Sequence, residues 1–328
     1  MTVQIADPAT DDAENRHRLQ PTPVETLLPG DVLLMRGRGD FSTLVAWCGD
    51  SIYSHVAMVG RDGNLLEAAT KGVAEASLAD RLKSPGTMLV DAFRPLANDL
   101  DPLTADDCEA VMKHATSLLG TGFAMDQLAT IGVIVAVRNK VFPDAPAWFR
   151  RLLYLAFRHA SENDPSKMIC SEFVYRCFAE NNAMPSGRLA PQIVIAASSC
   201  TPFPDIDWRA LIKEVMKLRG KHDPALKAMA GLAEEGTTDP AIEAWMTLEP
   251  VSDAELAAAA AAVRARFGSF DPGQQVLKAS TGSETSQGGA GWPVVESPNP
   301  KQVRPRDFAD TPCQRPLGRL MRNPHWRD

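Results

Sequence analysis

Short apolar runs bounded by turn residues mark the first third of the chain. They predict buried strands at residues 32–35, 55–59, 64–68 and 88–93. Arg61-Asp62-Gly63 joins the second strand to the third, and its Asp-Gly pair is a strong hairpin signal. The pattern therefore predicts antiparallel pairing between these two strands.

Helical spacing of apolar residues predominates later in the chain. It predicts helices at residues 41–48, 104–119 and 166–181, with a further helical stretch at 126–159 that prolines interrupt. The alanine-rich run 257–262 also favours helix. Strands come first and helices follow, which is the order of an α+β fold.

The amino-terminal stretch and the longest apolar run bear on localisation. Residues 1–23 are polar and acidic and lack the apolar core of a secretory signal, so we expect a cytoplasmic protein, with export by a signal-independent route left open. The apolar run 129–137 is far shorter than the roughly 20 residues that span a bilayer. No integral membrane segment is expected.

Composition narrows the functional classes. The 328 residues include 34 basic and 41 acidic side chains, and the resulting charge of −7 argues against a nucleic-acid partner. The six cysteines form no CxxC pair, which suits neither a disulfide framework nor a structural zinc site. No HExxH motif is present, so we expect no metal and no cofactor, and the cysteines should be free thiols.

Cys170 is the cysteine whose position suggests chemistry. It lies near the start of the helix predicted at 166–181, where the helix dipole and unpaired amides favour a thiolate. The alternative is that Cys170 is simply buried, as cysteines commonly are. Cys177, two turns further along nearly the same face, is interpreted as a packing residue.

His55 and Glu67 are candidate partners for that thiol. His55 begins an apolar strand, where a buried imidazole needs a hydrogen-bond partner. A tight two-residue loop would place Glu67 opposite Met58, on the face away from His55. One extra loop residue would instead place Glu67 opposite Ala57 and diagonal to His55, within reach of the imidazole.

Five segments in order carry a family resemblance: Gly30-Asp31-Val32-Leu33, Ser54-His55-Val56-Ala57-Met58-Val59, Leu66-Glu67-Ala68, Gly72-Val73 and Cys170-Ser171-Glu172-Phe173-Val174. Together they resemble the permuted papain-like amidases of the NlpC/P60 superfamily, the YiiX/YebB-like group. In ordinary papain-like enzymes the cysteine helix precedes the histidine strand, whereas here the histidine comes first.

Two further stretches fit the resemblance. Residues 122–126 look like the family's Gly-x-x-Tyr-Asp segment, with Met125 in place of the aromatic residue. Residues 303–309 resemble the segment that follows the cysteine helix and closes the domain. The implied fold is a circularly permuted papain-like fold, in which an antiparallel sheet packs on the nucleophile helix and a helical insertion follows.

The resemblance also implies a domain organisation. Residues 1–25 would form a flexible leader and 26–181 the catalytic core. Residues 182–300 would be a mostly helical insertion with a flexible segment near 281–291, and 301–328 would close the catalytic domain. Under this hypothesis, deleting everything beyond residue 300 would unfold the core.

The implied function is that of a cysteine hydrolase. Cys170 would attack the carbonyl of a peptide or isopeptide amide, His55 would transfer protons, and Glu67 would orient His55. The residues expected to line the cleft are Asp31, Tyr53, Ser54 and Ser171. The expected partners are a peptide, a peptidoglycan fragment or a lipid substrate.

Other functions remain open from the sequence. One is a lipid esterase, another an acyltransferase with a thioester intermediate, and a third a catalytically silent module that binds a peptide or lipid in the same cleft. The apolar stretch 132–158, edged by Arg138, Lys140, Arg150 and Arg151, would serve either an acyl pocket, a membrane surface or an ordinary pair of amphipathic helices.

Overall fold

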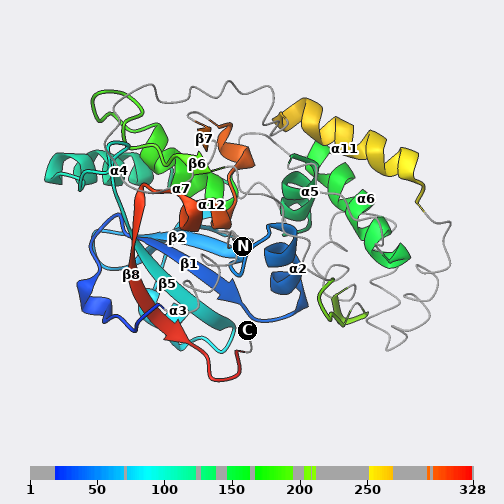
Figure 1. Ribbon diagram of the computed structural model, residues 1–328, viewed down its shortest axis with the longest axis horizontal. Coiled ribbons are helices and arrows are strands. Elements are labelled where there is room, and N and C mark those ends of the chain that lie inside the picture. Colours follow the sequence, from blue (N-terminus) through cyan, green and yellow to red (C-terminus); the bar gives the residue numbers. More distant parts are fainter. Residues whose placement is uncertain are drawn as a thin grey trace, which may run out of the picture.

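The computed structural model describes residues 19–69, 72–122, 127–137, 146–162, 167–194, 203–207, 209–211, 251–268, 294–295 and 298–326. The fold is α+β, as the order of elements predicts, and its centre is a six-stranded sheet in the order β4-β3-β2-β1-β5-β8 (Figure 1). Every neighbouring pair in this sheet is antiparallel.

The strands of the sheet are β1 (Val32–Gly37), β2 (His55–Val59), β3 (Leu65–Ala69), β4 (Gly72–Ala76), β5 (Thr87–Pro95) and β8 (Gln314–Arg322). The helices are α2 (Asp40–Cys48), α3 (Leu78–Lys83), α4 (Ala105–Ser117), α5 (Gln127–Val137), α6 (Ala147–Glu162), α7 (Cys170–Ala179), α11 (Asp253–Phe267) and α12 (Pro305–Asp310). Two 3-10 turns, η1 (Val24–Thr26) and η2 (Pro300–Gln302), and a small sheet of β6 (Ile193–Val194) and β7 (Val294–Val295) complete the described elements.

The β2–β3 hairpin adopts the register with the longer loop. Gly60 N–H donates to the Asn64 carbonyl at 2.7 Å, which leaves the three residues 61–63 in the loop. Gly63 has φ +73°, the left-handed conformation that three-residue hairpin loops need and that glycine adopts without strain. Met58 therefore pairs with Leu66, and the register continues to place Glu67 opposite Ala57.

Both faces of the sheet are covered, which explains why its strands read as continuous apolar runs. On one face Leu34, Val56 and Leu66 belong to the main core, together with Phe173 and Val174 of α7. On the other face a smaller cluster includes Leu33, Ala57, Val59 and Leu65, with Leu78 of α3 packed among them. The sheet thus lies between α7 and α3 (Figure 1).

A helical layer of α5, α6 and α11 lies beside the sheet (Figure 1). A Cβ atom added at Gly132 of α5 would lie 2.4 Å from the Ala156 carbonyl oxygen of α6, so glycine is needed for this close helix contact. The predicted helical stretch 126–159 is therefore two packed helices, and α11 joins them from beyond residue 181. Among the described helices none combines the length and apolar character needed to cross a membrane.

The basic residues at the edge of this layer have partners within the protein. Arg150 forms an ion pair with Asp253, the first residue of α11, and donates to the Val251 carbonyl. Arg151 is buried. Arg138 and Lys140 lie outside the described residues, as do most of the leader, the segment 281–291, Cys200 and residues 123–126 of the Gly-x-x-Tyr-Asp-like segment.

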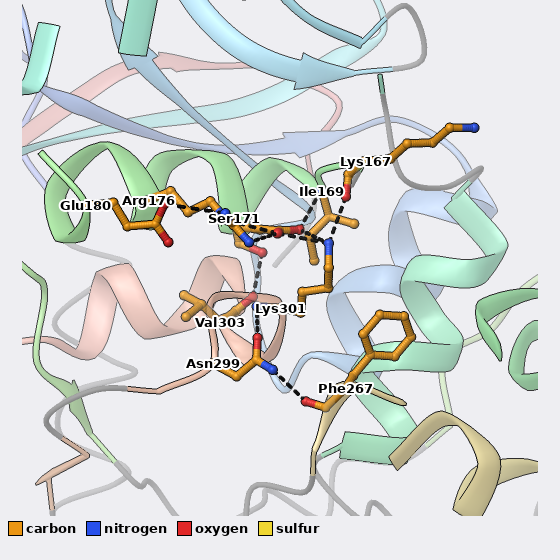
Figure 2. Close-up of polar contacts among 10 residues, drawn as sticks. Lys167, Ile169, Ser171, Arg176, Glu180, Phe267, Asn299, Lys301 and Val303 are labelled. Carbon is orange, nitrogen blue, oxygen red and sulfur yellow. Dashed lines mark hydrogen bonds and ion pairs between the residues drawn. The ribbon is translucent and has the colours of Figure 1, made fainter. Parts of the chain in front are cut away.

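The chain returns to the sheet after residue 300. β8 pairs with β5 along its length, and Arg319 of β8 forms a buried ion pair with Asp91 of β5 through Nε and Oδ1 at 2.7 Å. Figure 2 shows how η2 reaches α7: Lys301 Nζ lies 2.7 Å from Glu172 Oε2 and 2.7 Å from the Lys167 carbonyl oxygen. The segment from Asn299 onwards is thereby fastened to both the sheet and α7.

Candidate active site

Cys170 is the first residue of α7. The predicted helix began at Ser166, but residues 167–169 are not helical and Ile169 has extended backbone angles of φ −92° and ψ 166°. The later start moves Cys170 from the second turn of the expected helix to the first position of the observed one. There the amides of the first turn have no partner four residues earlier and stabilise a negative charge.

The Cys170 sulfur occupies the place where β2 and β3 separate. Val59 N–H donates to the carbonyl of Asp31, the residue just before β1, so by the two-residue alternation of an antiparallel strand the Val56 amide points towards β3 instead. The β2–β3 pairing ends at Met58 and Leu66. The backbone amides of Val56 and Ser171 are thus available to the sulfur, and both donate hydrogen bonds to it.

His55 lies beside the Cys170 thiol and is held from behind by Glu67. His55 Nε2 and Glu67 Oε2 are 2.7 Å apart, and the two side chains are 22% and 5% exposed. The three side chains come from β2, β3 and α7. The hairpin register places Glu67 two positions from Ala69, the residue opposite His55, which is the diagonal arrangement that lets a glutamate reach the ring.

The charges of these three groups depend on one another. Burial opposes ionisation of the Cys170 thiol, but His55 and the two backbone amides lower its pKa below the ordinary value. Burial also opposes a charged imidazole, yet Cys170 and Glu67 raise the pKa of His55 to about 10. Both shifts favour a thiolate next to an imidazolium, the pairing that makes a cysteine a strong nucleophile.

Other cysteines provide a contrast within the same molecule. Burial raises the pKa of Cys177, which lies on α7 but away from its start, and the pKa values of Cys108 and Cys313 are raised for the same reason. All five described cysteines are free thiols. A helix position and a histidine together distinguish Cys170 from these neutral thiols.

Asp31 and Tyr53, two of the residues expected to line the cleft, have partners inside the protein. Asp31 forms a bidentate pair with Arg94, with Nε–Oδ1 at 2.9 Å and Nη2–Oδ2 at 2.8 Å. The buried Tyr53 hydroxyl donates to Asp91 Oδ2 at 2.8 Å. Both side chains hold the sheet together, and this favours a structural role for them.

Ser54 and Ser171 are likewise engaged. The Ser54 hydroxyl lies 2.6 Å from that of Ser42 and accepts a hydrogen bond from the Gly37 amide. The buried Ser171 hydroxyl donates to the Val303 carbonyl at 2.5 Å, which ties α7 to the closing segment. Ser171 reaches the sulfur through its backbone amide and not through its side chain.

The sequence did not point to three features that the structure places at or near the candidate site: the Val56 amide, Lys301 and Arg81. Arg81 contacts Glu67 Oε1, on the oxygen that His55 leaves free. The sequence Ser77-Leu78-Ala79-Asp80 has the spacing of a helix start and could have revealed α3, since the Ser77 hydroxyl accepts from the Asp80 amide. Nothing in the local sequence shows that Arg81 faces the β2–β3 hairpin.

No group of three or more His, Cys, Asp or Glu side chains that could hold a metal ion occurs among the described residues. The site as described is built from one thiol, one imidazole and one carboxylate, with an arginine behind them.

Comparison with known proteins gives little beyond this geometry. No protein-family model matches the chain, and no curated protein matches it. Among solved structures, the metalloprotein yiiX from Escherichia coli O157:H7 is similar at 14% identity and a TM-score of 0.37, over 88% of this chain and 96% of that chain. A likeness this weak transfers neither a function nor a metal to this chain.

Proposed function

We propose that this chain is a cysteine hydrolase that cleaves an amide bond, with Cys170 as nucleophile, His55 as general acid and base, and Glu67 as the residue that orients His55. The observation that carries the proposal is a sulfur at the first position of α7, next to an imidazole whose Nε2 is 2.7 Å from a buried carboxylate. The proposed architecture is the permuted papain-like fold, because the histidine strand precedes the cysteine helix.

The first half of the reaction forms an acyl-enzyme. The Cys170 thiolate attacks the carbonyl carbon, a C–S bond forms, and the carbonyl oxygen becomes an oxyanion. Amides at the start of α7, including that of Cys170, are the donors in place to stabilise this charge. Because Glu67 holds Nε2 of His55, the proton passes from Nδ1 to the departing nitrogen as the C–N bond breaks.

The second half releases the acyl group. Water gives one proton to Nδ1 of His55 while its oxygen attacks the thioester carbon. The C–S bond breaks, a carboxylic acid leaves, and the thiolate and imidazolium are restored. Glu67 stays ionised throughout, because His55 and Arg81 lower its pKa against the effect of burial.

The decisive experiment follows the mass of the intact protein during incubation with a panel of peptide amides and acyl esters. We expect an acyl adduct and product with the native chain and neither with Cys170→Ala. His55→Asn should lose at least tenfold in rate, since general acid–base catalysis typically contributes 10²- to 10⁴-fold. Release of the trapped acyl group by water indicates a hydrolase, and release by an added amine indicates an acyltransferase.

Iodoacetamide labelling separates an enzyme from a silent binding module. At mildly acidic pH we expect Cys170 to be alkylated well before Cys108, the partly exposed cysteine whose pKa is raised. Cys108 is thus an internal control in the same sample. Equal labelling of the two thiols would count against the proposed thiolate and in favour of the module.

A further inference from the structure

Glu67 is the last residue of the proposed triad, but its carboxylate also contacts a further basic residue, Arg81. Glu67 uses Oε2 for His55 and Oε1 for the guanidinium of Arg81, so each carboxylate oxygen has one basic partner. The Glu67 side chain is 5% exposed, whereas Arg81 is 34% exposed. The carboxylate therefore depends on these two protein groups, and little on water, for its stabilisation.

The position of Arg81 follows from how α3 packs. Leu78, the first residue of α3, is buried in the same cluster as Ala57 and Leu65. Leu65 and Glu67 are two residues apart on β3 and share a face of the sheet. Arg81 lies three residues after Leu78 on α3 and projects to the same side, so the helix that covers this face also brings the guanidinium to Glu67.

We propose that Arg81 is a positioning residue of this site, which holds the Glu67 carboxylate ionised and aimed at His55 without touching the reacting atoms. The inference rests on the proposed function and extends its triad by one residue. Without Arg81, Glu67 keeps one partner, and burial then favours the neutral, rotated carboxyl group. A neutral Glu67 stabilises the imidazolium less, and the thiolate beside it forms only at higher pH.

The test measures the rate of Cys170 alkylation by iodoacetamide across the acidic and neutral pH range. In Arg81→Gln we expect the midpoint of the acid limb to rise by about half to one pH unit, the size of a nearby-charge effect in a partly screened site. The rate on the acid side then falls about three- to tenfold. Arg81→Lys should recover most of the loss, because it keeps the charge while losing the planar fork.

Arg61→Gln is the matched control. Arg61 also pairs with a carboxylate through two hydrogen bonds, to Glu109 at 2.5 and 2.7 Å, but this pair lies on the surface away from His55. The pH profile of Cys170 alkylation in Arg61→Gln should coincide with that of the native chain. A double variant, Glu67→Gln with Arg81→Gln, should shift no further than Glu67→Gln alone, and it removes both charges together if Arg81→Gln by itself fails to fold.

The possible outcomes distinguish a failure of the proposed role of Arg81 from a failure of the proposed hydrolase function. An Arg81→Gln profile that coincides with the native one, or that falls equally at every pH without a change of midpoint, overturns the role of Arg81 while Cys170 remains a reactive thiolate. An additional shift in the double variant also overturns it. If native Cys170 reacts no faster than Cys108, the proposed hydrolase itself fails.

Discussion

Glu67 on β3 and Glu172 on α7 are both buried carboxylates with basic partners. Glu172 is fully buried, and its oxygens accept from Lys301 Nζ and Arg176 Nε, whereas Glu67 shares its oxygens between His55 and the half-exposed Arg81. The Glu172 cluster is closed and consists of a carboxylate, a lysine and an arginine. The Glu67 cluster contains the imidazole of His55, which lies beside the Cys170 sulfur.

The two clusters therefore have different expected roles. The Glu172 cluster holds α7 in place, and the Glu67 cluster tunes the ionisation of the Cys170 thiol. Glu172 Oε2 also accepts from the Ile169 amide at 3.3 Å, so the closed cluster fixes the point where α7 begins. The Glu67 cluster fixes which charges surround Cys170. Substitutions in the first should chiefly cost stability, and substitutions in the second should chiefly cost reactivity.

The most severe test removes the closing segment. A chain that stops after residue 300 loses Lys301, the β8 edge of the sheet and the Arg319 partner of the buried Asp91. Buried carboxylates that each lose a cationic partner, together with an open β5 edge, should prevent folding. Circular dichroism and size-exclusion chromatography measure this, and a truncated chain that stays folded and active would reject the closing role of this segment.

Lys301→Met tests the closed cluster alone. Removing one partner of a buried ion pair should lower the free energy of unfolding by about 3–5 kcal/mol. Urea denaturation gives the value, with Arg61→Gln as a surface control that should stay near the native midpoint. Adding Glu172→Leu to Lys301→Met should restore part of the loss, because the buried carboxylate that has lost its lysine partner is then absent. If the urea midpoint of Lys301→Met equals that of the native chain, the Glu172 cluster does not chiefly stabilise the fold, and the proposed contrast with the Glu67 cluster fails.

Glu67→Gln and Glu172→Gln make the matched comparison, since each neutralises one carboxylate and keeps its shape. We expect Glu67→Gln to reduce Cys170 alkylation at mildly acidic pH by about tenfold, as the pKa of His55 falls and that of Cys170 rises. Glu172→Gln should reduce stability more and alkylation less. Urea denaturation and the alkylation rate, measured on both variants, must give opposite rankings for the comparison to stand.

The smallest expected effect concerns the pH dependence of stability. The pKa of His55 rises from 6.5 to about 10, so its contribution is complete below 6.5 and is lost as pH rises through 10. The pKa of Cys170 falls from 9.0, so its contribution is complete above 9.0 and is lost as pH falls through the lowered value. Between about 6.5 and 9 the folded and unfolded pair bind the same number of protons, and the slope is zero.

This plateau is measurable as a difference in thermal midpoint between the native chain and a variant with His55→Asn and Cys170→Ser. The difference should stay constant between about pH 6.5 and 9 and narrow on either side. A steady slope across this window would mean that the two groups are not a thiolate and an imidazolium. Hydrolysis should decline near pH 10, where His55 loses the proton that the departing nitrogen needs.

The sequence predicted local elements well because their signals are local. The β2 strand and the α2 helix lie within one residue of their expected positions, and Asp62-Gly63 marks the observed hairpin. The sequence left two registers open for Glu67, and these differ by one loop residue. Only the backbone conformation of Gly63 and the Gly60–Asn64 hydrogen bond select between them.

Long-range features were harder to predict. Lys301 lies 129 residues from Glu172, and Arg319 lies 228 residues from Asp91, so no local pattern connects them. Tyr53, Ser54 and Ser171 lie within two residues of the candidate histidine or cysteine, which made them reasonable candidates for the cleft, whereas Asp31 lies 24 residues before His55. Their side chains instead bond within the protein, because buried polar groups must find partners there.

The contact between Lys301 and Glu172 sets an order of events at the ribosome. At about 5–20 residues per second, the 129 residues that separate them take about 6 to 26 s to translate. During that interval Cys170 already exists, but the clamp that fixes its helix does not. We therefore expect the proposed thiolate of Cys170 to form in a nascent chain only after translation has passed η2.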